Sequence, residues 1–179
     1  MRSWTVIAAI LLALGGLSAV AGYEMAPPRT GPWQEIAWPF PRDGWPAGRA
    51  FRCGVADCGE DVEVYVRPKL GFCNCGSGVA DDDEVDRVAD VDMISARFTP
   101  IKAGDVVHVA DMPGRIRAYD VEMSGGKRSA IGIAVSHRCD LMVAAALGSG
   151  AAAGVQRAAL ALLGSREIRK WMTVAMDGS

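Results

Sequence analysis

Strand-like segments separated by turn residues fill the stretch from residue 105 to residue 147 and limit the possible folds more than any other feature. Pro113-Gly114 lies between the first two segments, and Ser124-Gly125-Gly126 precedes the third. Such turn residues between runs of alternating apolar and polar residues are typical of hairpins. The sequence therefore predicts an antiparallel meander of three or four strands. The expected strands are 105–112, 115–123, 129–136 and 141–147.

Two further segments complete the predicted fold. Residues 61–67 (DVEVYVR) place valines at alternate positions, which indicates a half-buried strand. Residues 151–163 (AAAGVQRAALALL) are rich in helix formers with one apolar stripe, and Ser165 is a candidate cap for a further helical turn. The expected fold class is α+β, with an antiparallel meander sheet packed by a C-terminal helix.

The N-terminus has the pattern of a signal peptide. Arg2 precedes an apolar run, and Ala19-Val20-Ala21 matches the small-residue rule for cleavage before Gly22. The competing interpretation is an uncleaved anchor, because residues 4–21 come close to the length that crosses a bilayer. We therefore expect a signal peptide at 1–21, an arm at 22–50 and a single domain at 51–179.

The arm is rich in proline and tryptophan, and we expect it to be extended because proline restricts its own φ and disfavours helix in the residue before it. Its aromatic residues should pack inward onto the domain, and the alternative is an aromatic platform for a sugar or a peptide. These residues are Trp33, Trp38, Phe40 and Trp45.

Five cysteines follow the predicted signal peptide. In an exported chain, Cys53, Cys58, Cys73 and Cys75 are candidates for two disulfides that join the first pair to the second. The alternative is a metal-handling protein that binds zinc or copper through these four sulfurs. Cys139 is then the candidate free thiol, and with His137 it could form the centre of a thiol enzyme.

Residues 81–92 contain seven carboxylates. Asp81 and Glu84 have the spacing of a capping box, so we expect a short acidic helix whose aspartates form a solvated face or steer a basic partner. An EF-hand is excluded, because Asp86 occupies the position that requires glycine. We also expect Arg115 and Arg117 to be exposed on their strand. The alternative is a small basic patch that holds an anionic ligand or pairs with acidic groups.

The sequence lacks the motifs that several classes of function require. Gly148-x-Gly150 precedes the C-terminal helix, but too little chain follows for a dinucleotide-binding unit. The net charge of −2 and the absence of a basic cluster argue against nucleic acid. No complete catalytic motif occurs, and no cofactor is indicated. The sequence therefore favours an exported, non-enzymatic cell-envelope protein, periplasmic or extracellular, which binds an unidentified protein or small molecule and contacts the membrane only if its N-terminal segment is uncleaved.

Overall fold

The computed structural model describes residues 29–71 and 75–177. The predicted signal peptide and residues 22–28 of the arm lie outside this part of the chain. Among the described helices, none combines the length and the hydropathy needed to cross a membrane.

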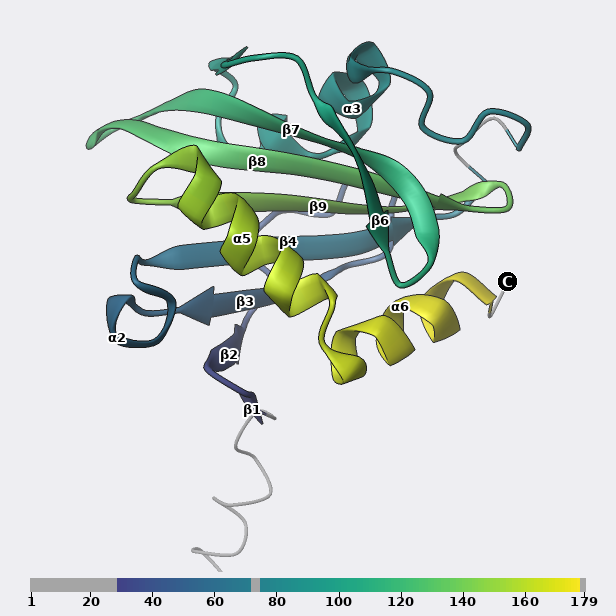
Figure 1. Ribbon diagram of the computed structural model, residues 1–179, viewed down its shortest axis with the longest axis horizontal. Helices are drawn as coiled ribbons and strands as arrows, with labels where there is room; N and C mark the ends of the chain where they lie inside the picture. Colours follow the sequence, from purple (N-terminus) through teal and green to yellow (C-terminus); the bar gives the residue numbers. More distant parts are fainter. Residues whose placement is uncertain (1–28, 72–74, 178–179) are drawn as a thin grey trace, which may run out of the picture.

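In the described part of the chain, nine strands form one sheet in which every pairing is antiparallel (Figure 1). The order is β1-β2-β3-β4-β9-β8-β7-β5, and β6 also pairs with β7. The α+β meander predicted from the sequence is thus confirmed. The strands are β1 (Arg29–Thr30), β2 (Trp33–Ile36), β3 (Arg49–Cys53), β4 (Val62–Lys69), β5 (Phe98–Pro100), β6 (Asp105–Val109), β7 (Met112–Met123), β8 (Gly126–His137) and β9 (Asp140–Gly148).

The first hairpin turn lies before the predicted Pro113-Gly114. Ala110 and Asp111 make this turn with φ values of 51° and 66°, and β7 already begins at Met112. Gly114 is needed for another reason: a Cβ there would overlap the Ala134 carbonyl on β8. Glycine marks a close approach of two strands at this position.

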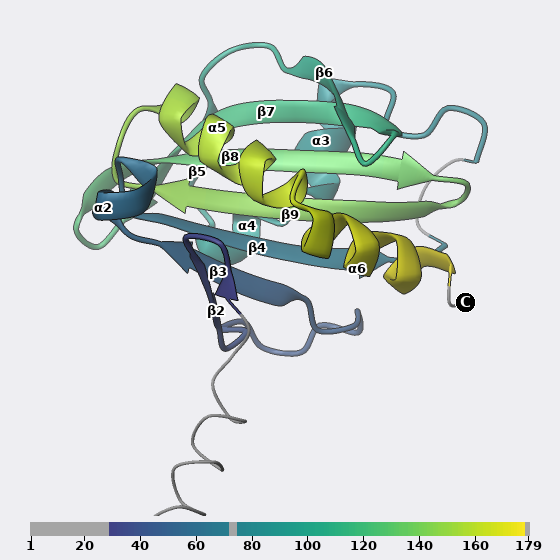
Figure 2. The same cartoon turned by 60° about the horizontal axis from the view of Figure 1, so that its bottom comes forward.

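Helices α5 (Ala152–Leu163) and α6 (Arg166–Asp177) cover one face of the sheet (Figures 1 and 2). Ser165 Oγ accepts a hydrogen bond from the Ile168 N–H at 3.4 Å, so the predicted cap is present and begins a full second helix. The buried core beneath the helices includes Val64, Ile133, Leu162 and Met172.

Helices α3 (Asp82–Val88) and α4 (Val91–Ile94) cover the opposite face. Figure 2 shows them behind the sheet when α5 and α6 lie in front. The predicted cap of the acidic helix is confirmed, because Asp81 Oδ1 accepts a hydrogen bond from the Glu84 N–H at 2.9 Å. Three layers result, with helices on both sides of a central sheet.

The acidic face of α3 is not a purely solvated surface, which corrects the prediction. Asp82 pairs with Arg115 at 2.5 Å, and Asp86 pairs with Arg117 at 2.7 Å. Tyr119 also donates a hydrogen bond to Asp86 at 2.7 Å. The predicted exposure of both arginines is wrong for the same reason: α3 packs on β7 and brings the two sets of charges together.

The glycine-rich turn before α5 holds a side chain of the protein itself. Gly150 N–H donates a hydrogen bond to Glu60 Oε2 at 3.0 Å, and a Cβ at Gly154 would overlap the same carboxylate. An anion at a helix N-terminus is favoured by the helix dipole and by unpaired N–H groups. Glu60 therefore occupies the place that a phosphate takes in nucleotide-binding proteins.

The predicted arm is partly integrated into the sheet. Strand β2 and the start of β3 fall within residues 22–50, so the expected boundary at residue 50 lies inside β3. Residues 37–48 between these strands are irregular and are called the Trp-rich segment below. Trp33 is buried, whereas Trp38, Phe40 and Trp45 are half-buried.

Candidate functional site: an aromatic pocket over buried charges

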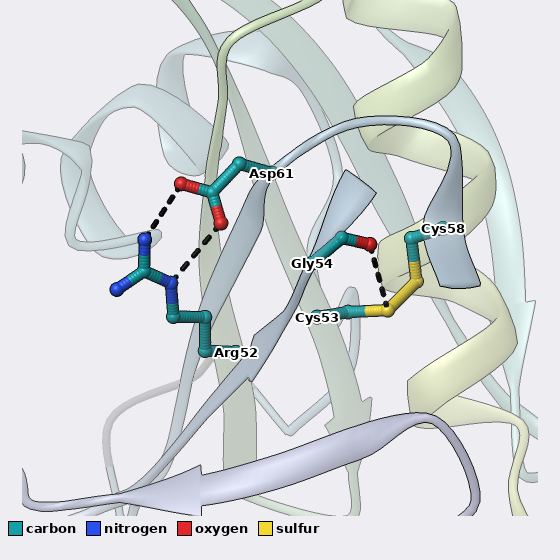
Figure 3. The surroundings of a disulfide bond; sticks show 5 residues. All are labelled: Arg52, Cys53, Gly54, Cys58 and Asp61. Atoms are coloured by element: carbon teal, nitrogen blue, oxygen red, sulfur yellow. Dashed lines mark hydrogen bonds and ion pairs between the residues drawn. A yellow bond between two sulfur atoms is a disulfide. The ribbon is translucent and has the colours of Figure 1, made fainter. Parts of the chain in front are cut away.

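The disulfides differ from the predicted pairing. Cys53 is bonded to Cys58, and Cys75 is bonded to Cys139. Figure 3 shows the first bond beside the ion pair of Arg52 and Asp61. The helical turn α2 (Val55–Cys58) brings Cys58 back to the end of β3, with a Cα–Cα distance of 6.0 Å.

The length of β4 explains why the two cysteine segments do not join. Cys53 lies opposite Val62 at the start of β4, whereas Cys75 comes after its far end. At about 3.3 Å per residue, these ends are roughly 23 Å apart. The far end of β4 lies beside the β8–β9 turn, where Lys69 pairs with Leu141, and this turn contains Cys139.

Disulfide formation also removes two chemical alternatives. Three of the four sulfurs proposed for zinc or copper are in disulfides, and Cys73 lies outside the described residues. No group of three or more candidate metal ligands occurs among the described residues. Cys139 is bonded to Cys75 rather than free, so the prediction of a free thiol is wrong, and this disulfide would have to be reduced before Cys139 could act as a nucleophile.

The hollow that contains Trp33 is a poor candidate for a binding site. It has a volume of about 530 Å³ and lies beside the first disulfide, lined by residues 31–34, Arg52, Gly54 and Asp57. Its aromatic residue, Trp33, is only 4% exposed, so its ring is committed to the core. Mostly polar, solvent-facing groups remain to contact a ligand.

A smaller pocket of about 210 Å³ has the features expected of a small-molecule site, namely apolar walls and a few converging polar groups. We call it the aromatic pocket. It is formed by the Trp-rich segment above strand β4, and its lining residues are Trp38, Phe40, Pro41, Arg42, Asp43, Trp45, Pro46, Ala47 and Arg67.

The rings of the pocket pack edge to face, on each other and on Tyr65 of β4. Trp38 and Phe40 have centroids 5.4 Å apart, and Phe40 lies 4.7 Å from Tyr65. Such T-shaped contacts are a favourable arrangement of aromatic quadrupoles. The inward packing predicted for the arm is therefore partial: Trp33 is buried, whereas Trp38, Phe40 and Trp45 line a pocket.

A charge cluster of Arg67, Lys69, Asp90 and Asp43 lies beneath these rings. Arg67 binds Asp90 through Nε at 2.6 Å and Asp43 through Nη2 at 2.7 Å. Lys69 Nζ donates to Asp90 Oδ1 at 2.6 Å and to the Val88 carbonyl at 2.9 Å. Arg67 is 2% exposed and Lys69 is 5% exposed, so both cations are buried with carboxylate partners.

Each buried cation also lies over an indole ring. The Arg67 guanidinium carbon is 5.8 Å from the centre of Trp38, and Lys69 Nζ is 6.0 Å from the centre of Trp45. Cation–π contacts at this distance are attractive. The cluster therefore holds the Trp-rich segment on the sheet through ion pairs and ring contacts together.

The ion pairs shift the pKa values of the groups involved. Hydrogen bonds from Arg67 lower the pKa of Asp43 from 3.8 to about 2. Burial by itself would lower the pKa of Arg67, but its hydrogen bonds to Asp90 and Asp43 raise it above the ordinary value. Burial and the hydrogen bond to Glu63 raise the pKa of Tyr65. Asp43 and Arg67 are therefore both ionised at neutral pH.

The local sequence explains how these groups meet. Tyr65, Arg67 and Lys69 alternate along β4 and share the face opposite its buried valines. Asp90 has φ 61°, a left-handed conformation between α3 and α4 that aspartate adopts more readily than most residues. Two short helices with a turn between them thus point one carboxylate at two cations.

Sequence reasoning did not identify this cluster. The sequence predicts a half-buried strand at 61–67 and a solvated acidic face on the helix within 81–92, so neither Arg67 nor Asp90 is expected in a buried ion pair. The Trp-rich segment is the one feature of the sequence that could have indicated this cluster. Its large apolar rings must pack against another part of the protein, and in the structure they pack on the second face of β4.

The described chain is thus an α+β protein with two disulfides and an aromatic pocket. No protein-family model matches the sequence, and a search of curated proteins finds no match. Among solved structures, the solution structure of cyanobacterial PsbP (CyanoP) from Synechocystis sp. PCC 6803 is similar over 80% of this chain and 75% of that chain. The TM-score is 0.43 and the sequence identity is 13%, values that support no transfer of function.

Proposed function

We propose that this protein is an exported, non-enzymatic binding domain and that the aromatic pocket is its ligand-binding site. The observation that carries the proposal is the pocket itself, in which three half-buried rings and three charged side chains line one small cavity. Rings that are neither fully buried nor scattered over the surface can exchange water for a ligand at little cost in structure.

The two disulfides support export, because such bonds persist in oxidising compartments and are rare in the cytosol. The cell-envelope location and the signal peptide at 1–21 belong to the same proposal. Protein secreted through its own leader should begin at Gly22, which intact-mass measurement would test. A mass that retains residues 1–21 would indicate an anchored protein instead.

The binding function is tested on the disulfide-intact protein labelled with ¹⁵N. Glucose, phenylalanine and triproline are titrated separately into it, and the indole N–H signals of Trp38 and Trp45 are followed by NMR. At least one probe should shift these signals, and Trp45→Ala should weaken that response.

Trp171→Phe on α6 is the matched control, because Trp171 lies on the opposite face of the sheet and lines none of the hollows described above. Circular dichroism establishes that each variant is folded. If neither these three probes nor the acidic sugar tested below shifts the two indole signals at millimolar concentration, the pocket is a packing feature and the proposal is wrong.

A further inference from the structure

The chemistry of the aromatic pocket restricts what it can bind. Its volume of about 210 Å³ is below the range of roughly 300 to 1,000 Å³ that is common for drug-sized ligands. The pocket therefore suits one ring-sized group. Trp38, Phe40 and Trp45 supply apolar surface, which requires an apolar face on the ligand.

Arg42 gives the pocket an uncompensated positive charge. It is exposed, and among the described residues it makes no ion pair or hydrogen bond. The other two charges in the lining, Asp43 and Arg67, neutralise each other through two hydrogen bonds of 2.9 and 2.7 Å. An anionic group on the ligand is therefore favoured at Arg42.

Asp43 sets a second requirement. Its Oδ1 accepts hydrogen bonds from the backbone N–H of Trp45 and from Arg67, whereas its Oδ2 accepts one from Arg67. A carboxylate has about four acceptor positions, so Oδ2 retains capacity for one more donor. Because Arg67 already balances its charge, Asp43 suits a neutral donor such as a hydroxyl better than an ammonium group.

We propose that the aromatic pocket binds an acidic sugar, a pyranose ring that carries a carboxylate. This inference rests on the proposed binding function and names its ligand class. The ring stacks on the aromatic walls, a hydroxyl donates to Asp43, and the carboxylate pairs with Arg42. An unsubstituted aromatic acid such as benzoate has no hydroxyl for Asp43, and an amino acid brings an ammonium group to a carboxylate that is already neutralised.

The test compares glucuronic acid with glucose, which has the same ring and hydroxyl pattern without the carboxylate. Both are titrated into the disulfide-intact protein at neutral pH, with the indole signals of Trp38 and Trp45 as the readout. Glucuronic acid should bind about fivefold more tightly, which is the upper range for a solvent-facing ion pair. Arg42→Gln should remove this preference, so that the two sugars bind with equal affinity.

Arg157→Gln is the matched control, because Arg157 is an exposed arginine on α5 across the sheet. It should leave the preference for glucuronic acid intact. Equal binding of the two sugars, or a preference that survives Arg42→Gln, overturns the acidic-sugar inference while a pocket that binds sugars still stands.

The failure of the inference differs from the failure of the proposed function. If phenylalanine or triproline shifts the indole signals and neither sugar does, the ligand class is wrong and the binding function is supported. If none of the four probes shifts them, both are wrong.

Discussion

Strand β4 has two buried faces that are stabilised by different chemistry. Val62, Val64 and Val66 face α5 and α6 in an apolar core. Tyr65, Arg67 and Lys69 face the Trp-rich segment and Asp90. Both faces are shielded from water. The first is stabilised by dispersion and the hydrophobic effect, whereas the second is stabilised because its buried charges are paired.

This comparison shows where the fold leaves room for function. An apolar core has no group that a ligand could contact, whereas the charged face has polar groups near an opening. The aromatic pocket lies on that second face, where Arg67 forms both part of the charge cluster and part of the pocket lining.

The charged face should show the largest single effect. Asp90→Asn removes the carboxylate charge that Arg67 and Lys69 share, while asparagine still tolerates the left-handed φ at this position. Because two cations are then buried with one carboxylate, we expect a loss of about 4 kcal/mol in the free energy of unfolding. Urea denaturation with intact disulfides measures it.

Asp92→Asn is the control for this change, because Asp92 is exposed on the same short helix. Its effect should stay within about 0.5 kcal/mol. If both variants lose the same small free energy of unfolding, the charge cluster contributes little to the stability of this face.

The apolar face should respond to lost volume. Leu162→Ala on α5 removes a fully buried side chain, and we expect a loss of about 3 kcal/mol from the transfer and cavity costs. Leu160→Ala on the same helix is only partly buried and should cost clearly less. If the two leucine variants lose the same free energy of unfolding in urea, Leu162 does not contribute more than Leu160 to the packing of α5 on the sheet.

The sequence predicted the apolar face much better than the charged one. The valines of β4 and the stripe of α5 have the periodicities of a strand and a helix, and both could be placed without knowledge of their partners. Arg67 and Asp90 are separated by 23 residues. Neither has a local pattern that distinguishes a buried ion pair from two exposed charges.

The same reason explains the errors about cysteines and the acidic helix. Cys75 and Cys139 are 64 residues apart, and only the end of β4 beside the β8–β9 turn brings them together. Asp86 meets Arg117 and Tyr119 only because α3 packs on β7. Pairings across the sheet depend on strand order, which local spacing does not contain.

A third test addresses this α3–β7 contact. Tyr119→Phe removes the hydroxyl that donates to Asp86 at 2.7 Å but keeps the buried ring. We expect a loss of about 1.5 kcal/mol in the free energy of unfolding, typical of a hydrogen bond to a charged acceptor. Asp83→Asn, at an exposed site on α3, is the control and should have almost no effect. A neutral Tyr119→Phe would indicate that Arg117 alone satisfies Asp86.

The smallest expected effect is the pH dependence of Asp43, which joins the Trp-rich segment to the charge cluster. Its pKa is about 2 in the folded protein, against an ordinary value of 3.8. A lowered folded-state pKa stabilises the fold above the ordinary value, and this contribution is lost as the pH falls from about 4 to about 2. Because the side chain is 36% exposed, solvent screening limits the contribution to about 1 kcal/mol or less.

Asp43→Asn checks this sign. The variant should be slightly less stable than the parent protein at pH 7, and most of the difference should be lost near pH 2, where about half of Asp43 in the folded parent protein is protonated. The indole fluorescence of Trp38 and Trp45 should change over the same pH range in the parent protein alone, since Asp43 accepts a hydrogen bond from the backbone N–H of Trp45. A difference in stability that persists unchanged at pH 2 would show that Asp43 acts through packing, and the aromatic pocket would then depend on its rings more than on the ion pair below them.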